Sequence, residues 1–207
     1  MWADLSKEWK VAFEEAWTAY YHGCVPIGAA VFDAEGELIL ADHNRGSEKG
    51  ILNRSIAHAE ANAVRRLESD AEYNIRTATL YTTMEPCPMC MGTCVMGNIK
   101  HLRFAAKAPY CGATHLLKTD AYIARKNLDY RYIGNEMEFI QIVLQSVFEI
   151  TMIEKGAKDI VLNSFRDMLP HAVMTAEKLY QEHLLNQWVD EARTMDFVFD
   201  EILSRAE

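Results

Sequence analysis

The spacing of hydrophobic residues changes in character about two thirds of the way along the chain. Over residues 5–22, apolar side chains recur every three or four positions, which predicts an amphipathic helix. Residues 25–44 contain two apolar runs separated by the turn-like residues 33–36, which predicts a β-hairpin. Beyond residue 134, helical spacing continues almost to the end of the chain. The first part is therefore expected to mix strands and helices, and the second to be helical.

Strands and helices are expected to alternate after the hairpin. Helices are predicted over residues 57–68 and 88–97, and strands over 77–83 and 101–106, where β-branched and aromatic residues are frequent. The segment 129–134 is compatible with a further short strand. This order predicts an α/β fold in which helices pack on a mixed central sheet.

The last third of the chain reads as consecutive helices. Helical spacing covers residues 135–154, 156–168 and 170–205, with Gly156 and Pro170 as the predicted breaks. The apolar stripe on the first of these segments is interpreted as a packing face.

Charge is distributed unevenly along the chain. Residues 1–134 contain 15 Lys and Arg against 16 Asp and Glu, whereas residues 135–207 contain 6 against 14. An acidic surface argues against contact with a phosphate backbone. We expect a domain at 1–134 and an acidic helical extension at 135–207. No run approaches the ~20 apolar residues of a membrane span, and no signal-peptide core is visible, so a cytoplasmic location is expected.

The cysteine spacing points to a metal site. A Cys-x-x-Cys pair in a reducing compartment is more often metal-binding or redox-active than a structural disulfide. Cys87 and Cys90 begin a predicted helix, whose N-terminus favours thiolates, and His58 begins another. Two thiolates and an imidazole are a donor set that Zn²⁺ prefers, and three protein ligands leave its fourth position open. Cys94 could close that position, although a small buried residue is the favoured interpretation.

Glu60 stands two residues after His58. In the middle of a helix, two such side chains would point about 200° apart. In the first turn this objection weakens, because side chains there surround the end of the helix axis. A carboxylate beside a metal, but not bound to it, can move protons between water and a leaving group.

These residues are part of a longer resemblance. The pattern His-x-Glu followed by Pro-Cys-x-x-Cys is typical of zinc nucleobase deaminases. Together with "VPIGAAVFDAEGELILADHNR", "IAHAEANAV" and "ATLYTTMEPCPMCMGTCVMGNIKHLRFAA", it resembles the cytidine deaminase-like superfamily over about residues 8–120. The similar branch contains tRNA adenosine deaminases and bacterial guanine deaminases. The resemblance implies a three-layer α/β fold with an all-helical C-terminal extension.

The resemblance also implies residue roles and a reaction. It assigns one zinc ion per subunit to His58, Cys87 and Cys90, proton transfer to Glu60, and base binding to Asn44 and the backbone around Ala59. The implied activity is that of an enzyme that removes an exocyclic amine by hydrolysis from a nucleobase or nucleoside.

Three substrate classes remain open at this point. A purine base or nucleoside, of guanine or adenosine type, is favoured by residues 107–120, which offer Tyr110, His115 and Asp120, with Tyr122 just beyond, as candidate pocket residues. Adenosine in tRNA is kept open by basic residues between positions 100 and 131 but is disfavoured by the acidic extension. Cytosine or cytidine is the third class. A zinc-binding interaction module is the non-enzymatic alternative.

The extension is the largest departure from the family pattern. It could cover the pocket, form a subunit interface or present a separate helical domain to a partner. Family members are commonly dimers whose pockets are bordered by a neighbouring subunit, so a homodimer or a higher homo-oligomer is expected.

Overall fold

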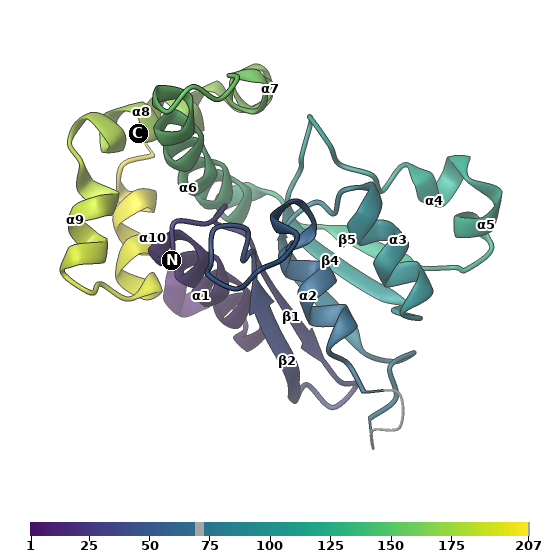
Figure 1. Ribbon diagram of the computed structural model, residues 1–207. Helices are drawn as coiled ribbons and strands as arrows, with labels where there is room; N and C mark the ends of the chain where they lie inside the picture. The colour runs from purple at the N-terminus through teal and green to yellow at the C-terminus, as the bar shows by residue number, and fades with distance from the viewer. Residues whose placement is uncertain (69–72, 207) are drawn as a thin grey trace.

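A five-stranded mixed sheet organises the computed structural model, which describes residues 1–68 and 73–206 (Figure 1). The strands follow the order β2-β1-β3-β4-β5. Their bounds are Gly28–Phe32 for β1, Leu38–His43 for β2, Thr79–Met84 for β3, His101–Ala106 for β4 and Asp129–Tyr132 for β5. β1 runs antiparallel to β2 and β3, whereas β3, β4 and β5 are parallel. The predicted mixed sheet and α/β fold are confirmed.

One face of the sheet is covered by α2 (Ala59–Arg65) and α3 (Pro88–Met96). Val31, Leu80 and Leu102 point toward these helices and are buried with them in one apolar cluster. Because successive residues of a strand face opposite sides, their neighbours in sequence serve the other face. All five residues of β1 are buried, as expected for a strand covered on both faces.

The other face is covered by α1 (Lys7–Tyr21) and α6 (Asn135–Glu154), which complete three layers. Phe32 packs there in one apolar cluster with Phe13 of α1 and Ile140 of α6. Gly28 allows α1 to approach β1 very closely, because a Cβ at this position would lie 2.0 Å from the carbonyl oxygen of Ala12.

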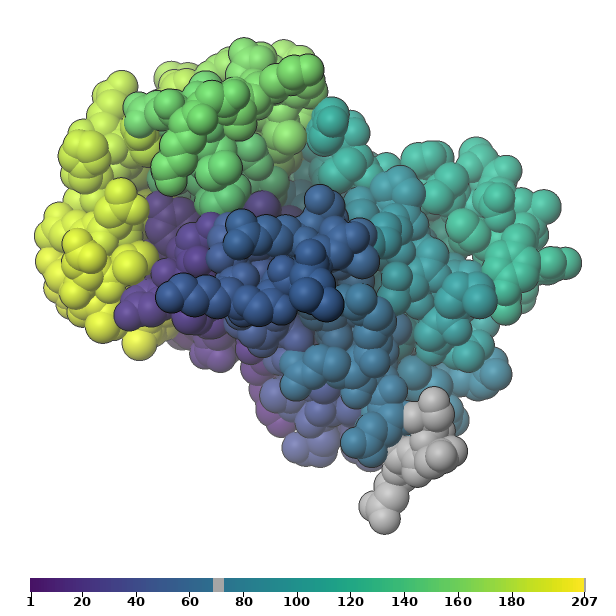
Figure 2. Space-filling model, in the orientation of Figure 1, coloured from purple at the N-terminus to yellow at the C-terminus, as the bar shows by residue number. Residues whose placement is uncertain are grey.

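Four further helices pack around α6 at the C-terminal end, namely α7 (Ile160–Met168), α8 (Pro170–Gln181), α9 (Leu184–Asp190) and α10 (Met195–Ser204). They form one continuous body with the N-terminal helix (Figure 2). The ring of Phe199 lies 5.5 Å from the ring of Phe13, so the apolar core extends across residue 134. The division into a domain at 1–134 and a helical extension at 135–207 stays a prediction.

Several element boundaries differ from the expected ones. The helix expected over 57–68 covers only Ala59–Arg65 and follows a 3₁₀ turn, η2 (Arg54–Ile56). A second 3₁₀ turn, η1 (Trp2–Asp4), precedes α1, and two short helices, α4 (Leu116–Thr119) and α5 (Ala121–Ala124), occupy a stretch with no predicted element.

The expected helical segment 170–205 is divided into three helices. The chain turns at His183 and at Ala192, whose backbones have φ values of 56° and 52°. This left-handed conformation ends a helix even though neither position is a glycine.

The longest helix, α6, has 20 residues, and its buried positions include polar side chains. Across the described residues, none of the helices combines the length and the apolar composition that a membrane crossing requires.

Candidate active site

Two helix N-termini converge at the predicted metal ligands. His58 is the N-cap of α2 and Cys87 is the N-cap of α3. Their carbonyl oxygens accept the first helical hydrogen bonds, from the backbone N–H groups of Asn62 and Met91, both at 2.9 Å. Each ligand is therefore held by the start of a buried helix.

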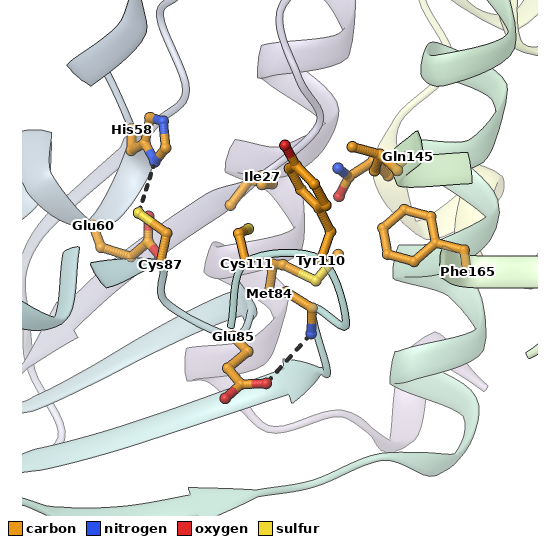
Figure 3. A pocket seen from close by; sticks show the side chains of 12 residues that line it. Ile27, His58, Glu60, Met84, Glu85, Cys87, Tyr110, Cys111, Gln145 and Phe165 are labelled. Carbon is orange, nitrogen blue, oxygen red and sulfur yellow. Dashed lines mark hydrogen bonds between the residues drawn. The ribbon is translucent and has the colours of Figure 1, made fainter. Parts of the chain in front are cut away.

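The three predicted ligand side chains meet at one point. His58 Nδ1 lies 3.5 Å from Cys87 Sγ (Figure 3). It lies 3.6 Å from Cys90 Sγ. All three donor atoms lie within 4.8 Å of one another. Zinc bonds of about 2.3 Å to sulfur and 2.0–2.1 Å to nitrogen, at tetrahedral angles, would place sulfur and nitrogen about 3.5 Å apart. The donor atoms therefore fit a zinc ion as they stand.

The electrostatics of this group also suit a cation. Contact with the Cys90 sulfur is the largest cause that lowers the pKa of Cys87, to about 4, and His58 lowers it further. The same contact raises the pKa of Cys90. Contact with Cys87 is the largest cause that raises the pKa of His58. The lowered pKa of Cys87 favours the thiolate, the form in which cysteine binds metals.

Glu60 lies beside this group without belonging to it. Its Oε2 atom accepts a hydrogen bond from the Cys90 thiol at 3.4 Å. The side chain is almost completely buried, and burial raises the pKa of its carboxyl group. A carboxyl group with a raised pKa is better suited to exchange protons than an ordinary exposed carboxylate.

Cys94 does not join the metal group found in the described part of the chain. It is fully buried in the apolar cluster between α3 and the sheet. Burial also raises the pKa of its thiol, which keeps it protonated.

The metal group opens into a small cleft of about 80 Å³. Its apolar lining consists mainly of Ile27, Met84, Ala108, Val161 and Phe165. Because Val161 and Phe165 belong to α7, and α6 contributes Gln145, the C-terminal helices form one wall of the cleft (Figure 3).

The carboxylates of two glutamates bind the loop that contains Tyr110. Glu85 accepts hydrogen bonds from the Thr114 N–H at 3.2 Å, from the Thr114 hydroxyl and from the Ala108 N–H at 3.4 Å. Glu138 of α6 accepts a hydrogen bond from the backbone N–H of residue 107 at 3.0 Å. The loop is therefore tied both to the segment after β3 and to α6.

Among the four candidate pocket residues of this region, Tyr110 lines the cleft. His115 and Asp120 instead stand at the N-caps of α4 and α5. The Tyr122 ring lies 4.8 Å from the Lys126 ammonium group, away from the metal ligands. The short helices thus lie outside the cleft lining.

Asn44 and Ala59 are both buried, but neither contributes to the cleft lining. Asn44 donates its backbone N–H to the carbonyl of Ile27 at 3.0 Å, and its Oδ1 accepts a hydrogen bond from the Gly46 N–H at 2.9 Å. Asn44 therefore contacts a residue of the cleft. Base binding by Asn44 and by the backbone around Ala59 stays a prediction.

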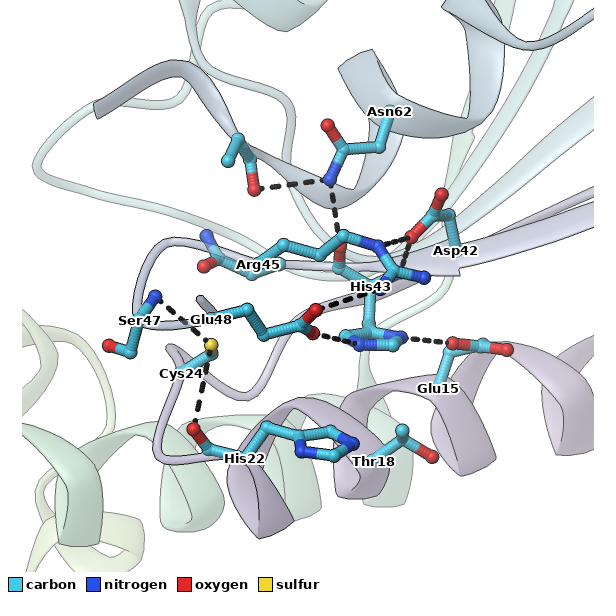
Figure 4. A network of polar contacts seen from close by, with 12 residues as sticks. Glu15, Thr18, His22, Cys24, Asp42, His43, Arg45, Ser47, Glu48 and Asn62 are labelled. Atoms are coloured by element: carbon cyan, nitrogen blue, oxygen red, sulfur yellow. Dashed lines mark hydrogen bonds and ion pairs between the residues drawn. The ribbon is translucent and has the colours of Figure 1, made fainter. Parts of the chain in front are cut away.

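A polar network supports the loop that begins at Asn44 (Figure 4). His43 Nδ1 lies 2.5 Å from a Glu15 carboxylate oxygen, and Nε2 lies 2.8 Å from a Glu48 oxygen. Burial alone would lower the pKa of His43, but the two hydrogen bonds to carboxylates outweigh it and raise the pKa. Arg45 donates to Asp42 at 2.7 Å and to Glu48 at 2.9 Å.

His22, His43 and Glu48 form a second set of potential metal ligands. Both His43 nitrogens already face carboxylates, and the Arg45 guanidinium lies against Glu48. A fixed cation at this position disfavours a metal ion. We interpret the set as a structural ion-pair network.

Sequence reasoning did not identify Gln145, Phe165 or Glu85 as site residues. A weak signal existed for the first of these. Gln141 and Gln145 are one helical turn apart and interrupt the apolar stripe of the predicted helix 135–154. Polar residues at such positions suggest a buried contact, but the pattern alone does not name the partner.

Comparisons with known proteins match the same part of the chain. The family model "Cytidine and deoxycytidylate deaminase zinc-binding region" matches residues 4–106. The tRNA-specific adenosine deaminase of Bacillus subtilis is 40% identical over 110 residues, which cover 52% of this chain and 65% of that protein. Its counterpart in Aquifex aeolicus is 39% identical over 108 residues, covering 49% of this chain and 67% of that protein.

A solved structure has the same core. It comes from a study of A-to-I editing by tRNA:A34 deaminases and has 26% sequence identity and a TM-score of 0.51. The match covers 62% of this chain and 96% of that chain. The likeness therefore leaves more than a third of this chain without a counterpart there.

Proposed function

The chain belongs to the family of the cytidine and deoxycytidylate deaminase zinc-binding region, within the cytidine deaminase-like superfamily, and from this premise we propose that it is a zinc-dependent hydrolytic deaminase. Its proposed substrate carries an exocyclic amine on a nucleobase or nucleoside. The observation that carries this proposal is the convergence of His58, Cys87 and Cys90 beside the buried carboxyl group of Glu60, at the end of a cleft.

In the proposed mechanism, His58, Cys87 and Cys90 hold the zinc ion. When bound in a site with three protein ligands, zinc lowers the pKa of water to about 7. Overall, one water molecule adds to the ring carbon that carries the amine, the carbon–nitrogen bond breaks, and ammonia leaves a carbonyl product.

Glu60 handles the protons of this exchange. Its carboxylate takes a proton from the attacking water and passes it to the adjacent ring nitrogen. It then takes the proton of the added hydroxyl group and delivers it to the leaving amine, so that a carbonyl group and ammonia result. The raised pKa of Glu60 supports both directions of transfer, because a carboxyl group that titrates closer to neutral pH donates and accepts more readily. The apolar walls of the cleft limit competing water.

A purine base or nucleoside is the favoured substrate class. The relatives named as adenosine deaminases act on a purine, and they share up to 40% identity with this chain. Adenosine in tRNA is the second candidate for the same reason. The 6 basic and 14 acidic residues within 135–207, whose helices line the cleft, weigh against a polyanionic substrate. The cytoplasmic location expected from the sequence and the homodimer implied by the resemblance remain predictions.

The proposal is tested by ammonia release from guanine, guanosine, adenosine and cytidine, with zinc content measured on the same samples. The Glu60→Gln variant, which keeps the shape of the side chain, should bind one zinc ion per chain and lose about 10²- to 10⁴-fold in turnover. As the matched contrast, Cys87→Ser should lose the metal itself.

If Glu60→Gln turned over at the wild-type rate, the proposed role of Glu60 in proton transfer would be wrong. Stoichiometric zinc without ammonia from any amine would instead indicate a zinc-binding interaction module. Inosine that appears only in RNA, with salt-dependent tRNA binding, would select the tRNA substrate.

A further inference from the structure

Helix α6 presents unpaired polar atoms in the protein interior. Within residues 1–68 and 73–206, three buried side-chain atoms have no hydrogen-bond partner, and all three belong to α6: Gln141 Oε1, Gln145 Oε1 and Ser146 Oγ. Buried acceptors are nearly always paired, so each such atom calls for an explanation. Gln145 is the one that lines the cleft, and its side chain is only 8% exposed.

The orientation of the Gln145 amide is set by its neighbour one turn along the helix. Gln145 Nε2 donates to Glu149 Oε1 at 3.3 Å. With Glu149 ionised, the opposite amide orientation would bring two acceptors together, whereas burial raises the pKa of Glu149 and so favours its protonated form. In the observed orientation, the carbonyl oxygen Oε1 is left as an acceptor with no partner in the protein.

Gln145 stands at the end of the cleft opposite the metal ligands. In Figure 3, Ile27, Met84 and Tyr110 lie between it and the Cys87 side chain. A base whose amine-bearing carbon lies at the metal would therefore turn its far edge toward Gln145. In adenine and cytosine, the ring nitrogen that bonds to the sugar in a nucleoside lies across the ring system from that carbon, and in the free base it can carry a hydrogen.

The surroundings of Gln145 suit a bare ring edge better than a sugar phosphate. Val161 and Phe165 of α7 form an apolar wall beside it. The acidic cleft-lining side chains in the described chain are Glu60 and Glu85, with His58 and Cys87 at the metal end, and no lysine or arginine is among them. A phosphate would find no cationic partner at this wall.

We propose that Gln145 determines substrate specificity by accepting a hydrogen bond from a ring N–H, and that the substrate is therefore a free nucleobase. This inference rests on the proposed deaminase function. Glu149 acts as a positioning residue, since it fixes which amide atom faces the ring. The acidic C-terminal third thus recognises the ring edge of the substrate, which the metal ligands do not contact.

The test compares each of guanine, adenine and cytosine with its analogue methylated at the sugar-bearing nitrogen and with its nucleoside. The wild-type protein should release ammonia from one free base with a kcat/KM about 10- to 100-fold above that of the methylated analogue. Gln145→Met, which removes the acceptor at similar volume, should lower kcat/KM for the base by about the same factor and leave the analogue almost unchanged. Ser146→Ala, which removes a buried hydroxyl that has no hydrogen-bond partner and lies outside the cleft lining, is the control and should behave like the wild type.

A second readout does not depend on turnover. Calorimetric titration of the Glu60→Gln protein with the same bases should show weaker binding when Gln145→Met is added, again for the free base only. Equal kcat/KM for base and nucleoside, or an equal loss on base and methylated analogue, overturns the inference while the deaminase proposal survives. If the wild type releases no ammonia from any compound, the proposed function fails, and the calorimetric comparison on its own supports or overturns the role of Gln145.

Discussion

At the scale of single residues, the start of α2 determines what His58 and Glu60 can do together. His58 has a ψ of 149°, an extended conformation, and the helix begins only at Ala59. The wide angular separation of positions i and i+2 within a helix therefore does not apply to this pair. The extended backbone at this N-cap thus brings an imidazole and a carboxyl group to the same end of the cleft.

His43 carries a prediction about pH. Its pKa is raised in the folded protein by hydrogen bonds to Glu15 and Glu48, which outweigh the opposite effect of burial. The resulting stabilisation is complete below the unfolded-state pKa of about 6.5 and is lost as the pH rises through the raised folded-state pKa. The free energy of unfolding should therefore decline on the alkaline side of that value.

The measurement is denaturant unfolding at a series of pH values. His43→Phe should lower the free energy of unfolding by about 1–3 kcal/mol near neutral pH, because two carboxylates lose their partner. The difference between wild type and variant should shrink as the pH rises. A difference that stays constant with pH would show that His43 is not held as a cation.

Local spacing explains why the metal ligands could be predicted and Gln145 could not. His58 with Glu60, and Cys87 with Cys90, are each placed by one short segment, so their relation is visible in the sequence. Gln145 reaches the cleft only because α6 packs against the sheet, 55 positions after Cys90 in the chain. Such a contact depends on tertiary packing, which periodicity predicts as a buried stripe without naming what it faces.

At the scale of elements, breaks in the helices were predictable where the residue type enforces them. Gly156 follows α6 with a φ of 95°, and Pro170 begins α8, as expected. The turns at His183 and Ala192 carry no such residue, so the segment 170–205 was wrongly expected to be continuous. Side chains with a Cβ are uncommon in the left-handed conformation, and propensity alone gives no sign of them.

The end of α9 gives a prediction about stability. The Ala192 N–H donates to the Val189 carbonyl and the Arg193 N–H to the Trp188 carbonyl, which is the hydrogen-bond pattern of a Schellman motif. Ala192→Gly should raise the free energy of unfolding by about 0.5–1 kcal/mol, because glycine adopts this conformation without strain. Thermal or denaturant unfolding would measure the change.

Ala192→Val is the matched contrast and should be destabilising, since a β-branched side chain is least tolerant of a positive φ. The two variants should move in opposite directions. If glycine destabilises the protein as it would in a helix interior, the left-handed assignment at this position is wrong.

At the scale of the whole molecule, the core connects the first and last parts of the chain. Phe199 of α10 is fully buried against Phe13 of α1, and the same apolar cluster reaches the sheet. Phe199→Ala should therefore lower the free energy of unfolding by about 3–5 kcal/mol. On heating this variant, helix content and bound zinc should be lost together in one transition at a lower temperature than in the wild type, even though Phe199 lies outside the cleft lining.

Circular dichroism and zinc release, followed during the same thermal ramp, would check this prediction. Met174→Ala, at an exposed position of α8, should change stability by no more than about 0.5 kcal/mol and serves as the control. Two separate transitions, with zinc retained after the first, would instead support independent folding of residues 1–134 and 135–207.

The cleft draws its reactive side chains and its distant wall from widely separated stretches of one chain. Replacements in α6 and α7 can therefore redirect which molecule is admitted while leaving the hydrolytic apparatus intact. Homologues with different substrates should accordingly differ most in the residues of these C-terminal helices. Exchanging the helices between such homologues should transfer substrate selectivity.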